Sequence, residues 1–249
     1  EYDFEDVAFG TVLGTTNTTN LTGVSYYVVG SNGSTAPGAG TLANPGTIAG
    51  AEASGASAII LVDNNSDGSR SLIDAVAQDN GTLTIADGQI LVTLVRGEAV
   101  DLTALGAASG GAPASLKLTG INTGGTVTTS LSSIDTVRPI LTSNSASTTV
   151  SLAGSATVQN VSVRNTGAGN GIEASYSANA TARIRSTDSS ITGSNAYAFY
   201  LTSTSGTSSV EFSDIATAGG LFVLGGISGT LSTTATGTNT IGAGGTGTG

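Results

Sequence analysis

The chain has 249 residues and a formal net charge of −10, and its single lysine and few arginines exclude the basic clusters that bind nucleic acids or anionic membranes. It contains no cysteine and no histidine, which excludes disulfides, thiolate metal sites and histidine catalysis. Aromatic residues make up only 4% and glycines number 37, so a core must be built from small side chains, as solenoids do by stacking their coils.

Residues 1–23 are expected to form a strand-forming tail and a polar connector. Tyr2 and Phe4 are two residues apart, as are Val7 and Phe9, so each pair lies on one face of an extended strand. The second pair is shifted by one position relative to the first, which predicts a strand with a bulge. Such a strand either folds back on its own domain or inserts into a neighbouring copy by β-augmentation. The second possibility makes these four side chains candidate assembly residues.

A strand, a glycine-rich loop, a short helix and a second strand are predicted over residues 26–62. Asn44 suits the N-cap and Pro45 the first position of the helix, which is expected to end near Ser54. The apolar run Ala58–Val62 predicts a buried strand.

The segment DNNSDGSRSLID follows this strand and has the spacing of a calcium-binding loop. Alternate oxygen-bearing side chains of a tight loop point inward, and Gly68 occupies the turn position. The predicted ligands of a structural Ca²⁺ are Asp63, Asn65, Asp67 and Asp74. An Asx-rich turn that binds its own backbone is the alternative. A second short helix is predicted over Ser71–Gln78.

From Gly81 onward, short strands rich in Thr, Ser and Val recur between glycine-rich connections. Apolar and polar residues alternate within them, so a parallel stack places one row inside and the other outside. Further strands are predicted around Leu91–Leu94, Ser115–Leu118 and Val127–Leu131. The residue pairs predicted to lie one coil apart are Ile184 with Val210, Asp188 with Asp214, and Ile172 with Phe199. These features predict a parallel β-solenoid, with an antiparallel β-sandwich as the alternative.

The run YYV…GTLANPGTI…AIILV resembles the opening of right-handed parallel β-helix proteins of the pectin-lyase-like class. In that class a strand is followed by a G-T-x-x-N-P turn, here Gly40–Pro45, then by a short helix and a strand ending near an Asp, here Asp63. The segment Gly81–Val92 resembles a coil of the β-helix passenger domains of bacterial surface proteins. One position departs from the class, because Gly46 stands where an aromatic residue is usual.

The resemblance implies an all-β, right-handed parallel β-helix with a short N-terminal capping helix. We expect this domain to cover residues 24–245 and to be followed by a Gly-rich tail at residues 246–249.

The same class includes polysaccharide lyases and glycoside hydrolases. Hydrolysis needs carboxylates that converge on one face, and lyase chemistry needs a Ca²⁺ carboxylate cluster with a basic residue. The Asn-Thr-Asp, Asp-Asp and Gly-His-Gly elements of the polygalacturonases are absent. Asp188 and Asp214 are more simply explained as turn residues, and Glu211 as the ion-pair partner of Arg183 or Arg185. We therefore predict that the chain is not an enzyme.

The expected function is that of a structural or adhesive protein on the outside of a bacterial cell. It would assemble into a fibre or sheath through its N-terminal strand and its solenoid ends. The expected partners are further copies of the chain, neighbouring domains of a larger surface protein, glycans or the cell surface, without nucleic acid and without membrane insertion. A carbohydrate-binding or carbohydrate-active β-helix is the alternative.

Overall fold

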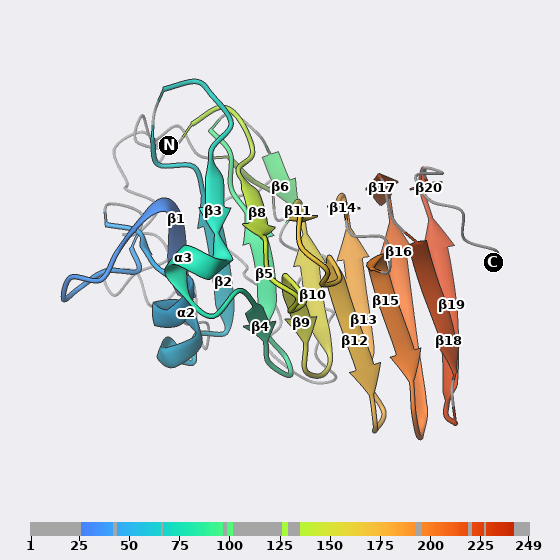
Figure 1. The fold of residues 1–249 in the computed structure, drawn as a ribbon. Coiled ribbons are helices and arrows are strands. Elements are labelled where there is room, and N and C mark those ends of the chain that lie inside the picture. Colours follow the sequence, from blue (N-terminus) through green and yellow to red (C-terminus); the bar gives the residue numbers. More distant parts are fainter. Residues whose placement is uncertain are drawn as a thin grey trace.

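The computed structural model describes residues 26–41, 44–65, 67–96, 99–101, 126–128, 135–192, 196–218, 221–226 and 228–241. The chain is an all-β protein whose short parallel strands form stacked sheets in a solenoid-like fold (Figure 1). The tail residues Tyr2, Phe4, Val7 and Phe9 and the strand predicted over Ser115–Leu118 lie outside the described residues. None of the described helices is long and apolar enough to cross a membrane.

Three parallel sheets, called A, B and C here, make up the stack. In stacking order, sheet A contains β1 (Tyr26–Ser34), β2 (Ala58–Val62), β5 (Ile90–Thr93), β10 (Ala156–Gln159), β13 (Thr181–Arg185), β16 (Thr207–Ser213) and β19 (Thr230–Thr236). Sheet B contains β3 (Leu72–Asp74), β8 (Ile140–Ser143), β11 (Ser162–Asn165), β14 (Asp188–Ile191), β17 (Ala216–Ala218) and β20 (Thr240–Ile241). Sheet C contains β4 (Leu83–Ile85), β9 (Val150–Leu152), β12 (Ile172–Tyr176), β15 (Tyr197–Ser203) and β18 (Leu221–Gly226).

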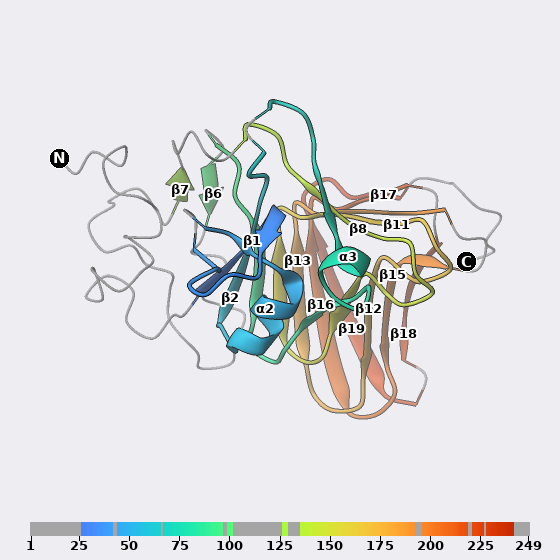
Figure 2. The same ribbon diagram turned by 60° about the vertical axis from the view of Figure 1, so that its left-hand side comes forward.

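The chain passes through sheets A, B and C in turn, and one such passage is called a coil. Figure 2 shows the three sheets obliquely along the stack. All pairs within these sheets are parallel, so the antiparallel sandwich is wrong for the described residues. A short antiparallel ladder of β6 (Ala99–Asp101) and β7 (Thr126–Thr128) lies in the connection between β5 and β8.

The coil-to-coil register is partly as predicted. Ile172 lies opposite Phe199, as its spacing along the chain predicted. The pairing of Ile184 with Val210 is wrong, because Ile184 lies opposite Phe212 and the coil between these strands of sheet A is longer than predicted. The coil is lengthened partly in sheet C, where β15 has 7 residues and a bulge whereas β12 has 5.

The core is a column of small and β-branched side chains enclosed by the three sheets. Val158, Ile184 and Phe212 stack in register on the inner face of sheet A, and each is at most 4% exposed. Phe199 from sheet C meets Phe212 edge-on, with ring centroids 6.4 Å apart and planes at 82°. Each coil thus buries its inner row against the coils above and below, which explains how a chain poor in aromatics builds a core.

One residue in the left-handed conformation turns the chain from sheet A to sheet B in each of four successive coils. The residues at this corner are Asn160 (φ 60°), Ser186 (φ 45°), Asp214 (φ 55°) and Gly237 (φ 67°). Asn160 N donates to the Arg185 carbonyl at 3.0 Å, and Ser186 N donates to the Ser213 carbonyl at 2.9 Å, so the corners are bonded to one another. Glycine, Asn and Asp adopt this conformation readily, whereas serine does so at a cost.

The predicted start of the first helix is wrong. Helix α2 (Ile48–Ser54) begins after Thr47, whose Oγ1 accepts a hydrogen bond from Gly50 N at 3.2 Å. Asn44 instead closes a turn in which its N–H donates to the Thr41 carbonyl at 3.2 Å. Pro45 and Gly46 then bond to the edge of β1, where the Pro45 carbonyl accepts from Ser34 N at 2.9 Å. Similarly, the segment predicted as a second helix forms β3 and then α3 (Ala75–Gln78).

Gly46, the departure from the pectin-lyase-like pattern, has a structural reason. A Cβ at Gly46 would lie 2.0 Å from the Tyr27 hydroxyl oxygen, and one at Gly50 would lie 2.1 Å from it. The ring of Tyr27 therefore occupies the space beside both positions. An aromatic residue elsewhere in the sequence thus fills the position beside the helix.

Candidate functional site

The four predicted calcium ligands are all engaged in hydrogen bonds with the protein, and Asp63 and Asn65 share one set of these bonds, because Asn65 N donates to Asp63 Oδ1 at 3.2 Å. Asp63 is fully buried and accepts from Ser71 N at 2.8 Å, and Asn65 accepts from the side-chain amide of Asn32. Asp67 accepts from the Ser69 hydroxyl and backbone N–H, and these bonds lower its pKa. Asp74 is the N-cap of α3.

These bonds are typical of Asx turns and helix caps, in which a side chain satisfies nearby backbone N–H groups. The described residues contain no group of three or more His, Cys, Asp or Glu positioned to hold a metal ion. Binding of Ca²⁺ by Asp63, Asn65, Asp67 and Asp74 stays a prediction.

Arg138 joins successive coils at the corner between sheets A and B. Its guanidinium donates to Asn160 Oδ1 and to the Ser186 carbonyl at 3.2 Å, and lies 3.7 Å from Asp188 Oδ1. Asn160, which is 4% exposed, in turn donates to the Thr93 carbonyl at 3.2 Å. This single side chain therefore connects groups of three coils through charge-assisted hydrogen bonds.

Arg70 extends the same network toward the N-terminal coils. Its Nε donates to the Arg138 carbonyl at 2.8 Å, and its Nη2 donates to Ser162 Oγ. Ser162 Oγ then donates to Asp188 Oδ1 at 2.7 Å. The charged groups at this corner are bound to the protein itself, and the network holds the stack together.

The predicted stacking of Asp188 on Asp214 is wrong. Asp188 lies opposite Ala216 in sheet B, in keeping with the longer coil found in sheet A. Asp214 occupies the left-handed corner, where it accepts from Ser213 Oγ and from Thr238 N at 2.9 Å. These bonds, the one from Ser213 first, lower the pKa of Asp214 and mark it as a turn residue.

Arg183 and Glu211 form the ion pair expected on the outer face of sheet A. They lie directly opposite on β13 and β16, with Arg183 Nε 2.7 Å from Glu211 Oε2. Beside them is a hollow of about 210 Å³, which is lined by Arg185, Glu211, Phe212, Ser213, Thr234 and Thr236. One carboxylate paired with an arginine does not supply the two acidic groups that glycoside hydrolysis requires.

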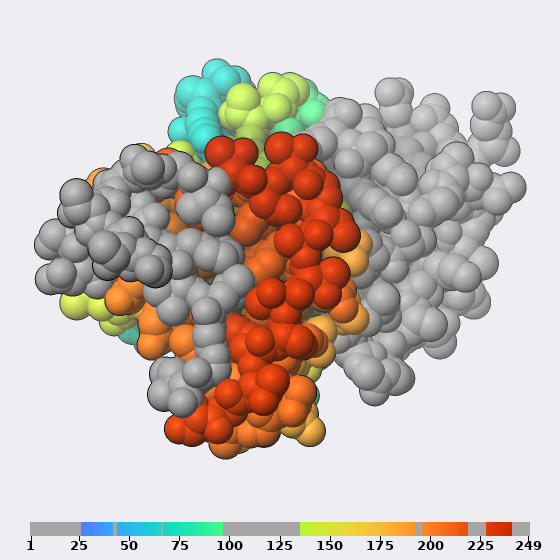
Figure 3. Space-filling model, turned by 90° about the vertical axis from the view of Figure 1, so that its right-hand side faces the viewer, coloured from blue at the N-terminus to red at the C-terminus, as the bar shows by residue number. Residues whose placement is uncertain are grey.

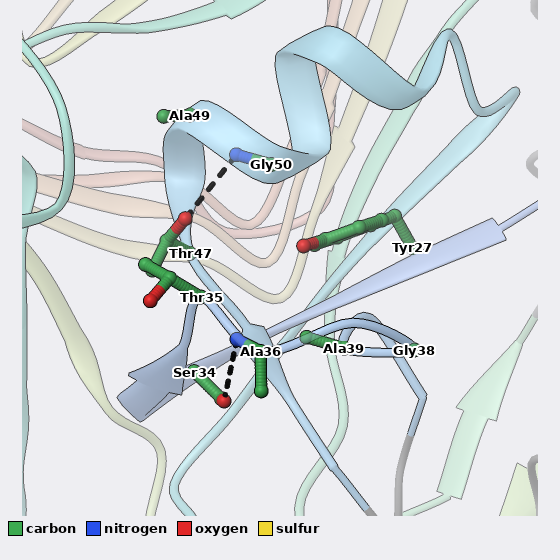
Figure 4. A pocket seen from close by; sticks show the side chains of 9 residues that line it. All are labelled: Tyr27, Ser34, Thr35, Ala36, Gly38, Ala39, Thr47, Ala49 and Gly50. Carbon is green, nitrogen blue, oxygen red and sulfur yellow. Dashed lines mark hydrogen bonds between the residues drawn. The ribbon is translucent and has the colours of Figure 1, made fainter.

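A pocket of about 380 Å³ lies between α2 and the loop after β1 (Figure 4). Tyr27 points its hydroxyl into this space, and Ser34 and Thr47 lie across it (Figure 4). Burial raises the pKa of Tyr27, and a hydrogen bond with the backbone of Thr47 partly offsets this effect. The polar side chains of the lining are the hydroxyls of Tyr27, Ser34, Thr35 and Thr47, and none of the lining residues is charged.

Tyr197 and Tyr200 form an aromatic cluster on the outer face of sheet C. Their ring centroids are 5.0 Å apart and their planes are inclined by 34°. Glu173 lies opposite Tyr200 on β12, where its Oε2 accepts from Thr148 Oγ1 and from Asn170 Nδ2 at 2.6 Å. The cluster combines two partly exposed aromatic rings with a carboxylate held in place by its neighbours.

This cluster is hidden in the sequence because the two tyrosines are three positions apart. Strict alternation places residues at that spacing on opposite faces of a sheet. A bulge between Tyr197 and Phe199 shifts the alternation, so that both tyrosines face outward while Phe199 faces the core. The only available signal was the concentration of aromatic residues in YAFYLT.

The two ends of the stack differ in how their edge strands are covered. At the β1 end, the carbonyls of Gly40 and Pro45 accept hydrogen bonds from β1. Glu52 of α2 accepts from Thr84 N at 2.6 Å on β4, the edge strand of sheet C. At the opposite end, β19 has no further strand beside it among the described residues. Figure 3 shows its atoms, in red, at the surface of this end.

Comparison of the chain with known protein families, with curated proteins and with solved structures finds no match.

Proposed function

We propose that the chain is a non-enzymatic structural or adhesive protein of a bacterial cell surface. In this proposal the stack is a right-handed parallel β-helix, and α2 caps its N-terminal end. The observation that carries the proposal is the network of Arg70, Arg138 and Asp188. These charged groups bond coil to coil rather than converging on a hollow that could hold a substrate.

A rod needs strong bonds between its repeats, since each coil contacts only its neighbours. The guanidinium groups at the A/B corner supply such bonds along the stack. The outer surface is rich in Ser and Thr, which offer many hydroxyls for contacts with other copies or with surface glycans. Assembly through the N-terminal strand with Tyr2, Phe4, Val7 and Phe9 is part of the proposal.

Incubation of the purified chain with a panel of acidic and neutral polysaccharides tests the non-enzymatic part. We expect no release of reducing ends and no unsaturated products, with and without Ca²⁺. Product release that is lost in Glu211→Gln or Asp188→Asn variants would overturn the proposal. Sedimentation of the chain over a range of concentrations tests the structural part, for which we expect assemblies larger than a monomer.

A second function, carbohydrate binding, is favoured by the cluster of Tyr197, Tyr200 and Glu173. Aromatic faces beside a few fixed polar groups are typical of ligand sites, and a sugar ring can pack its C–H face on tyrosine. We expect Tyr200→Ala to abolish retardation of the chain in gels containing a bound polysaccharide. Thr84→Ala, which changes an exposed residue of the same sheet, is the matched control. Equal retardation of both variants would exclude this site.

A further inference from the structure

The outer edge of β19 carries hydrogen-bonding groups whose direction follows from its pairing with β16. Thr230 N donates to the Gly206 carbonyl at 2.9 Å, so the even-numbered residues of β19 face β16. In a parallel pair, the backbone N–H and C=O groups of successive residues point alternately toward the partner strand and away from it, so those of the odd-numbered residues point away from β16. Leu231, Thr233 and Ala235 therefore direct their backbone groups toward the free edge.

Among the described residues, this edge has none of the features that protect sheet edges from pairing with another chain. β19 has the sequence TLSTTAT, which is rich in β-branched residues and contains no charge, no proline and no glycine. Thr233 and Ala235 point inward, opposite the buried Val210 and Phe212, yet they are exposed. By contrast, Gly40, Pro45 and Gly46 bond to the edge of β1.

We propose that β19 pairs antiparallel with β19 of a second copy, about a twofold axis at Thr233. The proposal rests on the assembly described under the proposed function and names its contact. With the axis at Thr233, each strand overlaps the other over its whole length, Thr230–Thr236. Leu231 faces Ala235 of the second copy, Thr233 faces its own equivalent, and all three residues form hydrogen-bonded pairs.

The side chains of this pairing are complementary as well. Odd-numbered residues of β19 face odd-numbered residues of the second copy, and even-numbered residues face even-numbered ones. The inward-facing side chains of one strand therefore lie beside the inward-facing side chains of the other, and the same holds for the outward-facing ones. The outer row then pairs Thr230 with Thr236 and Ser232 with Thr234, and cross-strand Thr and Ser pairs stabilise antiparallel sheets. The carboxylate of Glu211, opposite Thr234 in sheet A, is paired with Arg183 at 2.7 Å. The carboxylate of Asp214 lies beyond the end of β19, where it accepts from Thr238 N.

Disulfide formation measures the register, because the chain has no cysteine of its own. Ser232 and Thr234 of opposite copies form a pair with Cα atoms about 4.5 Å apart, which is within the range of a disulfide. We expect an equimolar mixture of Ser232→Cys and Thr234→Cys to give a disulfide-linked dimer on oxidation. Each variant alone is expected to remain largely unlinked. Equal linking of a single variant, or no linking of the mixture, would overturn the proposed register.

Proline at position 233 tests the contact without breaking the fold. The N–H of Thr233 faces the free edge, so Thr233→Pro removes partner bonds but none of the bonds to β16. We expect Thr233→Pro to sediment as a monomer at concentrations at which the wild type and Thr233→Val associate. The circular dichroism spectrum of Thr233→Pro should match that of the wild type. If it does not, the disulfide experiment with Ser232→Cys and Thr234→Cys still tests the β19 contact.

The outcomes separate this inference from the proposed function. Association that persists in Thr233→Pro would overturn the β19 contact and leave assembly through another surface. A wild-type chain that stays monomeric at every concentration would overturn both.

Discussion

Replacement of Tyr176 by phenylalanine is expected to stabilise the protein. Tyr176 ends β12, points into the core and is 3% exposed. Its hydroxyl oxygen is buried and has no hydrogen-bond partner among the described residues. A buried polar group without a partner costs about 1–3 kcal/mol, and phenylalanine keeps the ring while removing that group.

We expect Tyr176→Phe to raise the free energy of unfolding by about 1 kcal/mol, which corresponds to about 2–4 °C in melting temperature for a chain of this size. The difference in free energy of unfolding between Tyr176→Phe and the wild type should increase at alkaline pH. Burial, and then the charge of Asp87, raise the pKa of Tyr176 above its usual value of 10.0. Above pH 10 the unfolded chain loses this proton before the folded chain does. Wild-type stability therefore falls as pH rises, by up to about 1.4 kcal/mol per pH unit, and the variant lacks this contribution.

Urea unfolding at pH 7 and at more alkaline pH, above the usual tyrosine pKa, measures both effects. Tyr200→Phe is the matched control, because its hydroxyl is on the outer face and its removal should change stability by less than about 0.5 kcal/mol. A Tyr176→Phe variant that is less stable than the wild type would show that the hydroxyl is satisfied. The assignment of an unfavourable buried group would then be refuted.

Four further perturbations test other parts of the structure. Arg138→Lys keeps the charge but loses the planar fork, and should lower the free energy of unfolding by about 2 kcal/mol in urea; no change would contradict the proposed role of the corner network. Ser186→Asn should raise the free energy of unfolding by about 0.5 kcal/mol, because asparagine adopts positive φ readily. Ser186→Val should lower it by about 1 kcal/mol, because valine tolerates positive φ poorly, and the reverse order of stability would contradict the left-handed conformation at this corner. Phe199→Ala should cost about 3–5 kcal/mol, and a cost below about 1 kcal/mol would contradict its place in the core. Millimolar Ca²⁺ should raise the melting temperature of the wild type but not of Asp67→Asn, and equal melting curves would contradict the calcium prediction.

The parts of the fold that follow from alternation could be predicted from the sequence. Ile172 and Phe199 were paired correctly, because the spacing predicted between them already includes the bulge between Tyr197 and Phe199. Ile184 was paired wrongly, because the bulge and extra length of β15 change the coil spacing by an amount that no local pattern reveals. Alternation predicts which face a residue occupies, but register also depends on the length of every intervening turn.

Local propensity was a weaker guide where tertiary contacts compete with it. Asn44 and Pro45 have the preferences of a helix start, yet Asn44 closes a turn with Thr41, Pro45 bonds to β1, and Thr47 becomes the cap. The ion pair of Arg183 and Glu211 could be predicted, since both residues flank inward-facing positions. The Arg138 network could not, because its partners come from coils that the sequence places far apart.

Cryo-electron microscopy of the intact, undissociated protein would show whether the rods join through β19. We expect rods of stacked parallel strands that meet end to end through β19, with sheet A continuing across the junction. Isolated rods at every concentration, each with a free β19 edge, would contradict this expectation.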